Sequence, residues 1–185
     1  MTVVLSSSSP VASVAVFGPD WRLNCSKSQQ GNNMASGALL QMLGDIGFSL
    51  EDATLCVADL GPGSFTGVKV AVTMAKTLAF ALGVKVAGVT AFDLVSAVQS
   101  VAIPSRKGEY FLREPGREPE IVRALPTGSI GYGATFDNQQ YPLAERCTAG
   151  VVSKATDPVD LIPLYIAEPS ISKAKDTTVM GGPNA

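Results

Sequence analysis

The chain has 185 residues, with 14 Lys and Arg against 16 Asp and Glu, a formal net charge of −2 and no histidine. This length suits one domain, or two small lobes that share a core. An apolar fraction of 46% excludes wholesale disorder, and the lack of a basic excess argues against a chain that grips nucleic acid by itself. Without histidine, the commonest general base and the usual histidine-containing metal sets are also excluded.

The three cysteines are odd in number and widely spaced, and no C-x-x-C is present. We therefore expect neither a disulfide framework nor a zinc site, and a reducing cytoplasm as the location. No basic region precedes the first apolar run, so a signal peptide is not expected. The longest apolar stretch, Val68–Val89, is interrupted by three lysines, which argues against a membrane span.

The chain opens with apolar runs at Thr2–Leu5 and Ala12–Phe17, and Trp21–Cys25 is compatible with a third strand. Short turns between them predict an antiparallel meander. Asn32–Ile46 is then predicted as a helix, because its apolar residues recur at three- and four-residue spacing and an asparagine stands at its start.

A strand–helix–strand–helix order follows. Thr54–Ala58 is a continuous apolar run, typical of a strand buried on both faces. A long helix is predicted over Phe65–Leu82, another buried strand over Lys85–Val89, and a helix over Ala91–Gln99 with Thr90 as its cap. This order is typical of an α/β core with parallel strands.

The pattern weakens in the last third of the chain. Val101–Pro104 and Glu109–Arg113 are expected as a strand pair, and Ala149–Ala155 as a short helix, but prolines and glycines break up the remainder. We predict an N-terminal α/β lobe over residues 1–104, a shortened C-terminal lobe over 105–169 and a flexible tail over 170–185.

A glycine-rich loop joins the predicted strand at Thr54–Ala58 to the long helix. Its candidate phosphate-facing residues are Gly61, Gly63, Ser64, Thr66 and Gly67. Backbone N–H groups at such a turn suit a phosphate at a helix N-terminus. The glycine spacing matches neither the dinucleotide fingerprint nor the P-loop, so a ligand-facing loop and a purely structural turn are both open. We interpret Asp59, just before the loop, as a solvated residue and Ser6–Ser9 as a turn.

The two long helices carry a candidate partner interface. On the second helix, Lys69, Thr73, Lys76 and Phe80 fall on one face, and an exposed aromatic on a polar stripe often anchors a partner. On the first helix, the corresponding face carries Gly37, Gln41 and Gly44. The alternative is that Phe80 folds under the second lobe and that the helix tolerates its glycines.

The run Gly61-Pro-Gly-Ser-Phe-Thr-Gly67 resembles the signature of the bacterial TsaB (YeaZ) family. Leu5–Val16, Ser49–Ala58, Arg106–Tyr110 and Pro163–Tyr165 resemble other segments of that family. The resemblance implies an actin-like and sugar-kinase-like ATPase fold, related to ribonuclease H, with a reduced second lobe here. It also implies a non-catalytic subunit, without catalytic residue, metal or cofactor, that serves the formation of threonylcarbamoyladenosine at position 37 of ANN-decoding tRNAs.

The family resemblance implies pairing with the paralogue TsaD through these two helices, with the ATPase TsaE in the wider complex. We also expect a homodimer when the chain is alone, and contact with tRNA only through the complex. Ser6 stands where the family has an acidic residue, which argues against independent ATP hydrolysis. The rival hypothesis is a free-standing nucleotide-binding enzyme of the same fold, kinase-like or peptidase-like.

Overall fold

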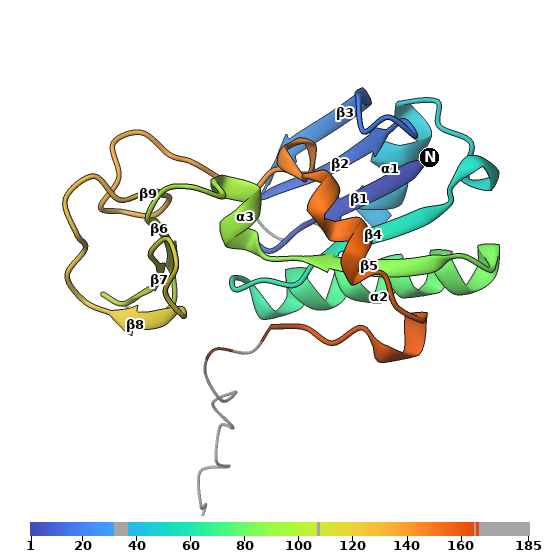
Figure 1. Ribbon diagram of the computed structural model, residues 1–185. Coiled ribbons are helices and arrows are strands. Elements are labelled where there is room, and N and C mark those ends of the chain that lie inside the picture. The colour runs from blue at the N-terminus through green and yellow to red at the C-terminus, as the bar shows by residue number, and fades with distance from the viewer. Residues whose placement is uncertain (32–36, 107, 165, 167–185) are drawn as a thin grey trace, which may run out of the picture.

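The computed structural model describes residues 1–31, 37–106, 108–164 and 166. Two sheets form its framework, and α3 lies between them (Figure 1). The first sheet has the strand order β3-β2-β1-β4-β5, and the second has the order β8-β7-β6-β9. The strands of the first sheet are β1 (Thr2–Ser6), β2 (Val11–Phe17), β3 (Leu23–Gln30), β4 (Leu55–Asp59) and β5 (Lys85–Val89). Those of the second are β6 (Val101–Pro104), β7 (Tyr110–Arg113), β8 (Glu120–Val122) and β9 (Ile130–Gly131).

The first three strands form the predicted antiparallel meander. The third strand, predicted at Trp21–Cys25, is present but its predicted bounds are wrong, because β3 begins at Leu23 and continues to Gln30. Trp21 belongs to the turn instead: its φ is 59°, and its N–H donates to the carbonyl of Gly18. Its ring stacks on Phe17 at 5.2 Å between centroids, so the turn is held by side-chain packing that local sequence does not reveal.

The parallel part of the sheet is the unit β4–α2–β5, as predicted from the buried apolar runs. β4 lies between β1 and β5 and runs parallel to both. The helix α2 spans Phe65–Leu82, which confirms the predicted bounds, and the Ser64 hydroxyl caps it by accepting from the N–H of Gly67. The helix α1 is described over Gly37–Asp45, and residues 32–36 of the predicted helix lie outside the described part.

Each face of the first sheet has its own cover. One face packs against α1 and α2 through an apolar core from both helices and the strands. The opposite face is covered by α3 (Ala91–Val95) and by two 3-10 helices, η2 (Ala144–Arg146) and η3 (Ala149–Lys154). Figure 1 shows α2 running along one side of this sheet and the orange η2–η3 segment on the other.

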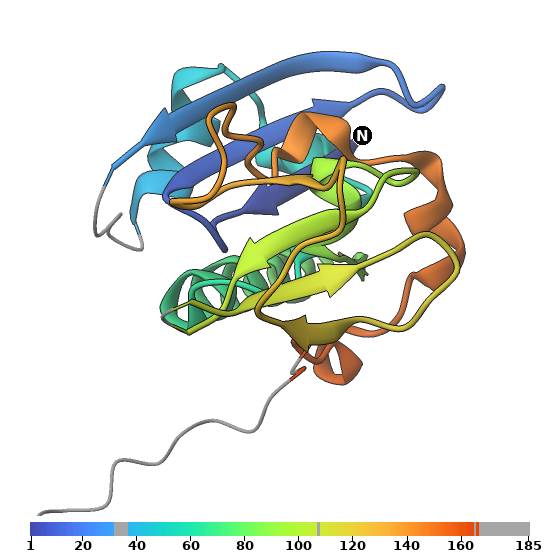
Figure 2. The ribbon, with the colours of Figure 1, turned by 90° about the vertical axis from the view of Figure 1, so that its left-hand side faces the viewer.

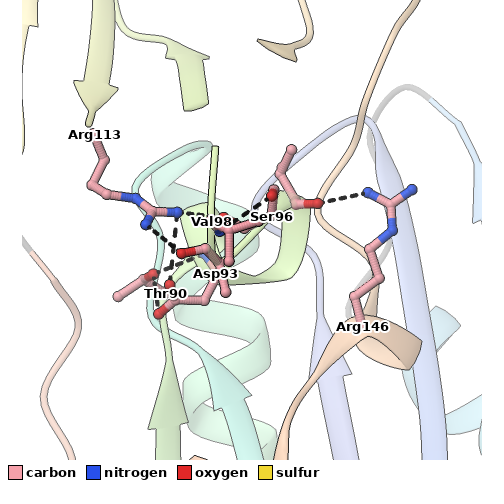
Figure 3. A network of polar contacts seen from close by, with 8 residues as sticks. Thr90, Asp93, Ser96, Val98, Arg113 and Arg146 are labelled. Atoms are coloured by element: carbon pink, nitrogen blue, oxygen red, sulfur yellow. Dashed lines mark hydrogen bonds and ion pairs between the residues drawn. The ribbon is translucent and has the colours of Figure 1, made fainter. Parts of the chain in front are cut away.

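The helix α3 is shorter than the predicted Ala91–Gln99 and ends at Val95. The Thr90 hydroxyl caps its start, as predicted, by accepting from the N–H of Asp93. At its end Ser96 is extended, and two arginines bind the terminal carbonyls from opposite sides (Figure 3). The two guanidinium groups thereby donate to carbonyl groups that would accept N–H groups of the helix if it continued for another turn.

The second sheet is small and lies on the other side of α3 from the first sheet in Figure 1, and it faces the viewer in Figure 2. β6 and β7 form the expected strand pair, and apolar side chains of β6 pack on α3. The predicted helix near 149–155 is the 3-10 helix η3, and a fourth short 3-10 helix, η4, spans Pro158–Asp160. The division into lobes at residue 104 stays a prediction, and the predicted tail over 170–185 lies outside the described residues.

The helix α2 is the one helix in the described ranges with the length and composition of a membrane span. Core helices of globular proteins share these properties. In this structure α2 packs against β1, β4 and β5, and its buried residues form a continuous stripe toward the sheet. Those residues are Val68, Ala71, Val72, Ala75 and Ala79.

Candidate functional site

A hollow of about 660 Å³ lies where the first sheet, the N-terminus of α2 and the second sheet meet. We call Ser6–Ser9 the serine turn and Gly61–Gly67 the glycine loop, and both contribute to its wall. The lining is rich in hydroxyl groups and contains no charged side chain among the described residues. Its hydroxyl-bearing members are Ser7, Ser8, Ser9, Ser64, Thr66, Ser105 and Tyr132.

The carboxyl group of Asp59 lies beneath this hollow, at the end of β4, and is fully buried. Its Oδ2 accepts the Ser6 hydroxyl at 2.7 Å and its Oδ1 accepts the N–H of Gly61 at 2.8 Å. The N–H of Ser8 lies 3.4 Å from Oδ2. One carboxyl group therefore joins the end of β1, the serine turn and the start of the glycine loop.

Burial raises the pKa of Asp59 above its ordinary value, and hydrogen bonds from Ser8, Ser6 and Gly61 lower it in part. Desolvation outweighs these bonds because the carboxylate form loses all contact with water. The same carboxyl group contributes, after burial, to a raised pKa of Tyr132, whose side chain lines the hollow.

The prediction that Asp59 is a solvated loop residue is therefore wrong. The sequence held a usable signal, because strands β1 and β4 end in Ser6 and Asp59, and parallel neighbours end at the same sheet edge. A carboxylate at that edge is covered by whatever loop follows the strand. Here the glycine loop folds back over it, and this closure depends on contacts distant in sequence.

The glycine loop packs directly on the serine turn. The N–H of Ser64 donates to the Ser8 carbonyl at 2.7 Å, and the Ser7 hydroxyl donates to the Gly67 carbonyl at 2.8 Å. A Cβ on Gly63 would lie 2.2 Å from the Ser8 carbonyl oxygen, and one on Gly67 would lie 1.7 Å from that of Ser7. These two glycines are thus required for a close approach of backbone to backbone.

The structural function of the loop does not exclude a ligand-facing one. Of the candidate phosphate-facing residues, Gly63, Ser64, Thr66 and Gly67 line the hollow, whereas Gly61 is buried below it. The hollow offers hydroxyl groups and the N-terminus of an 18-residue helix, which together suit a neutral polar group or a phosphate. It offers no charged side chain that would act as a general acid or base within the described residues.

A second concave surface lies between the exposed sides of α1 and α2. It has a volume of about 660 Å³ and a mainly apolar lining, and we call it the helix groove. Of the predicted interface residues, Gly37, Lys69 and Thr73 line it, together with Leu40 and Phe65. The ammonium group of Lys69 lies 4.0 Å from the centroid of the Phe65 ring, so its charge is placed over an aromatic face.

The remaining predicted interface residues lie around the helix groove and not in it. Phe80 is 82% exposed on the last turn of α2, so it does not fold under the second sheet. Gln41 and Gly44 are exposed on α1, and a Cβ on Gly44 would meet nothing within 4 Å. Lys76 has an intramolecular function that sequence reasoning missed: its ammonium group donates to the carbonyls of Val159 and Leu161 at 3.2 and 3.1 Å.

Solved structures define the fold class. A Pseudomonas aeruginosa protein described as similar to the peptidase YeaZ superposes with a TM-score of 0.75 at 20% identity. The superposition covers 90% of this chain and 99% of that one. YeaZ from Pseudomonas aeruginosa gives 0.73 at 21% identity, over 89% and 99% of the two chains. The protein therefore has the actin-like, ribonuclease H-like α/β fold, as predicted.

Sequence comparisons add similarities to named proteins over part of the chain. Residues 28–107 match the family described as TsaD, tRNA N6-adenosine threonylcarbamoyltransferase. The Bacillus subtilis (strain 168) tRNA threonylcarbamoyladenosine biosynthesis protein TsaB is 36% identical over 63 residues. That match includes 34% of this chain and 28% of the relative, so the chain spans less than a third of the curated relative that it matches. Over these residues the chain is similar to the TsaD family and to a TsaB protein, and over most of its length its fold is that of YeaZ.

Proposed function

We propose that this chain is a non-catalytic scaffold subunit in the formation of threonylcarbamoyladenosine on tRNA. It would bind a TsaD-type paralogue through the exposed sides of α1 and α2 and hold that enzyme in an active arrangement. The observation that carries the proposal is the helix groove. It is an apolar concave surface on the two helices for which the sequence predicts a partner interface. The name of the Bacillus subtilis relative, a threonylcarbamoyladenosine biosynthesis protein, supports a function in the formation of this modified nucleoside.

The exposed aromatic group on α2 supports an interface on this side of the molecule. Phe80 is among the most exposed large apolar side chains in the described residues, and Leu40 and Phe65 are half exposed in the groove. Apolar surface of this kind gains free energy when a partner removes it from water. In the complex, a TsaE-type ATPase would join the paralogue, tRNA would meet the complex as a whole, and the location would be cytoplasmic. A homodimer through the same face is the proposed state of the chain alone.

The rival function is a free-standing nucleotide-binding enzyme, and the hydroxyl-lined hollow favours it. Its two walls, the serine turn and the glycine loop, can bind phosphate through backbone and hydroxyl groups. The non-catalytic function is better supported, because the hollow lacks a charged side chain in the described residues and the chain has no histidine. ATP turnover by the purified chain separates the two: sustained multiple turnover would establish the rival.

The interface is tested with Phe80→Glu, because a carboxylate at a desolvated contact is costly without a partner charge. Val98→Glu is the matched control, since Val98 is 79% exposed and lies outside α1 and α2. We expect Phe80→Glu to weaken binding to a TsaD-type protein at least about tenfold and the control to leave it unchanged. Light scattering and titration calorimetry measure this, with circular dichroism to confirm folding. Equal binding by both variants, or no binding by the wild type, would contradict the proposal.

A further inference from the structure

A third and smaller hollow lies between α3 and the η2–η3 segment, on the face of the first sheet opposite α1 and α2. It has a volume of about 240 Å³, and its polar lining consists of Asp93, Arg146, Thr148 and Lys154. The last three belong to the η2–η3 segment that covers this face. The hollow therefore combines two cations, one hydroxyl and one carboxylate.

Arg146 is fixed in place by neutral groups. Its Nη1 donates to the carbonyl of Val95 at 3.1 Å and to that of Tyr141 at 3.4 Å, as Figure 3 shows for the first of these bonds. Within the described ranges, no carboxylate forms an ion pair with Arg146 or with Lys154. The two carbonyl groups thus hold one edge of the guanidinium group in place, and no ion pair among the described residues neutralises its charge.

The carboxylate of the hollow is already engaged on its other side. Asp93 Oδ2 accepts the Thr90 hydroxyl at 2.9 Å, and its Oδ1 lies 3.8 Å from Nη2 of Arg113. Arg113 is only 13% exposed and comes from β7, so its charge balances Asp93 within the structure (Figure 3). Glu145, which directly precedes Arg146 in the sequence, accepts the Ser26 hydroxyl of β3 at 2.7 Å and forms no ion pair with Arg146 among the described residues. Two cations of the hollow, Arg146 and Lys154, therefore have no ion-pair partner among the described residues.

We propose that this hollow binds a phosphate group. The planar guanidinium of Arg146 matches the oxygen atoms of a phosphate, and its carbonyl bonds remove part of the entropy that an arginine loses on binding. Lys154 at the rim supplies a second charge, and the Thr148 hydroxyl a further donor. The volume admits one such group with its hydration. The phosphate comes either from a small phosphorylated ligand or from the backbone of an RNA.

This site is independent of the proposed partner interface, because the two lie on opposite faces of the first sheet. A docked partner on α1 and α2 leaves the hollow open. Failure of phosphate binding would leave the scaffold function intact, and failure of partner binding would leave the phosphate site intact.

The test is a titration of the ¹⁵N-labelled full chain with inorganic phosphate at constant ionic strength, followed by amide chemical shifts. We expect saturable shifts confined to Thr148–Lys154 and the end of α3. Lys154→Gln should weaken the apparent affinity about tenfold. The exposed Lys154 side chain has no hydrogen bond or ion pair among the described residues, so this change leaves the fold intact. Arg117→Gln is the control, since Arg117 lies in an exposed ion pair with Glu114.

A second titration, with a single-stranded RNA oligonucleotide in low salt, identifies the source of the phosphate. Shifts of the same amides at lower concentration than inorganic phosphate assign the site to an RNA backbone, and weaker or absent shifts assign it to a small ligand. The proposal is overturned if inorganic phosphate causes no saturable shift at these amides. It is also overturned if Lys154→Gln binds phosphate as the wild type does.

Discussion

The glycines of the glycine loop and those of α1 stand in opposite environments. A Cβ on Gly63 or Gly67 would collide with backbone atoms of the serine turn, whereas one on Gly37 or Gly44 would meet nothing within 4 Å. In the sequence the two pairs look alike, because each consists of glycines that lie in a predicted helix or directly before it. The first pair is required by a contact inside the chain. The second leaves a shallow surface that the fold itself does not use, which is where a partner can approach closely.

This difference separates two kinds of function. At the N-terminus of α2, the loop and the serine turn are joined by hydrogen bonds and by the buried Asp59, so this region is a fixed part of the core. On the exposed sides of α1 and α2, apolar groups remain in water and Lys69 lies over an aromatic ring. Substitutions in the first region should change stability, and those in the second should change association.

Gly67→Ala should have the largest effect. The new methyl group would lie 1.7 Å from the Ser7 carbonyl oxygen, so the loop and the serine turn must separate. We expect a loss of about 3 kcal/mol or more in the free energy of unfolding, as for overpacking that moves backbone. Urea denaturation followed by circular dichroism measures it. A variant as stable as the wild type would show that the close approach is not required.

Asp59 gives the next largest effect and a pH dependence. Asp59→Ala should lose about 2–3 kcal/mol, because the Ser6 hydroxyl and the Gly61 N–H would be left buried without this acceptor. Asp20→Ala, in an exposed ion pair, is the control and should lose almost nothing.

The pH dependence has a defined sign. Because burial raises the pKa of Asp59, the folded state holds the proton to a higher pH than the unfolded state, whose ordinary value is 3.8. The stability that Asp59 contributes is therefore complete below pH 3.8 and falls as the pH rises through the raised pKa. Asp59→Asn cannot ionise, so its stability relative to the wild type should increase from pH 4 toward pH 8. A constant or opposite difference in urea denaturation would show that the hydrogen bonds outweigh desolvation.

Gly44→Ala should have the smallest effect, and in the opposite direction. The residue is exposed within α1 and its Cβ position is empty, so alanine should stabilise the chain by about 1 kcal/mol. The bulkier Gly44→Leu should fold as well but associate more weakly with a partner or a second copy, since it fills the shallow surface. Thermal denaturation and light scattering measure the two properties. Unchanged association by Gly44→Leu would place the interface elsewhere on the molecule.

Local patterns along the chain were enough to predict most strands and the long helix of the first sheet. Continuous apolar runs predicted β1, β2, β4 and β5, and three- and four-residue spacing predicted α2 to the residue. These patterns depend on neighbours along the chain, because a strand or helix buries a face that repeats at a short, fixed period. The resemblance of the glycine loop to a family signature also predicted the fold class that the solved structures support.

The contacts of the buried polar groups, in contrast, depend on how distant segments of the chain pack together. Asp59 follows an apolar run and is predicted from the sequence as a loop residue. In the structure it is buried by the glycine loop, which starts two residues later, and by the serine turn, whose contacts come from 51 to 53 residues earlier in the chain. Lys76 is predicted from the sequence as part of the partner interface, yet its ammonium group donates to carbonyls more than 80 residues along the chain. Such contacts depend on which segments pack together in the folded chain. The free-energy cost of burying a charge or a carbonyl depends on the hydrogen-bond partners that these segments supply, and no local sequence pattern reveals them.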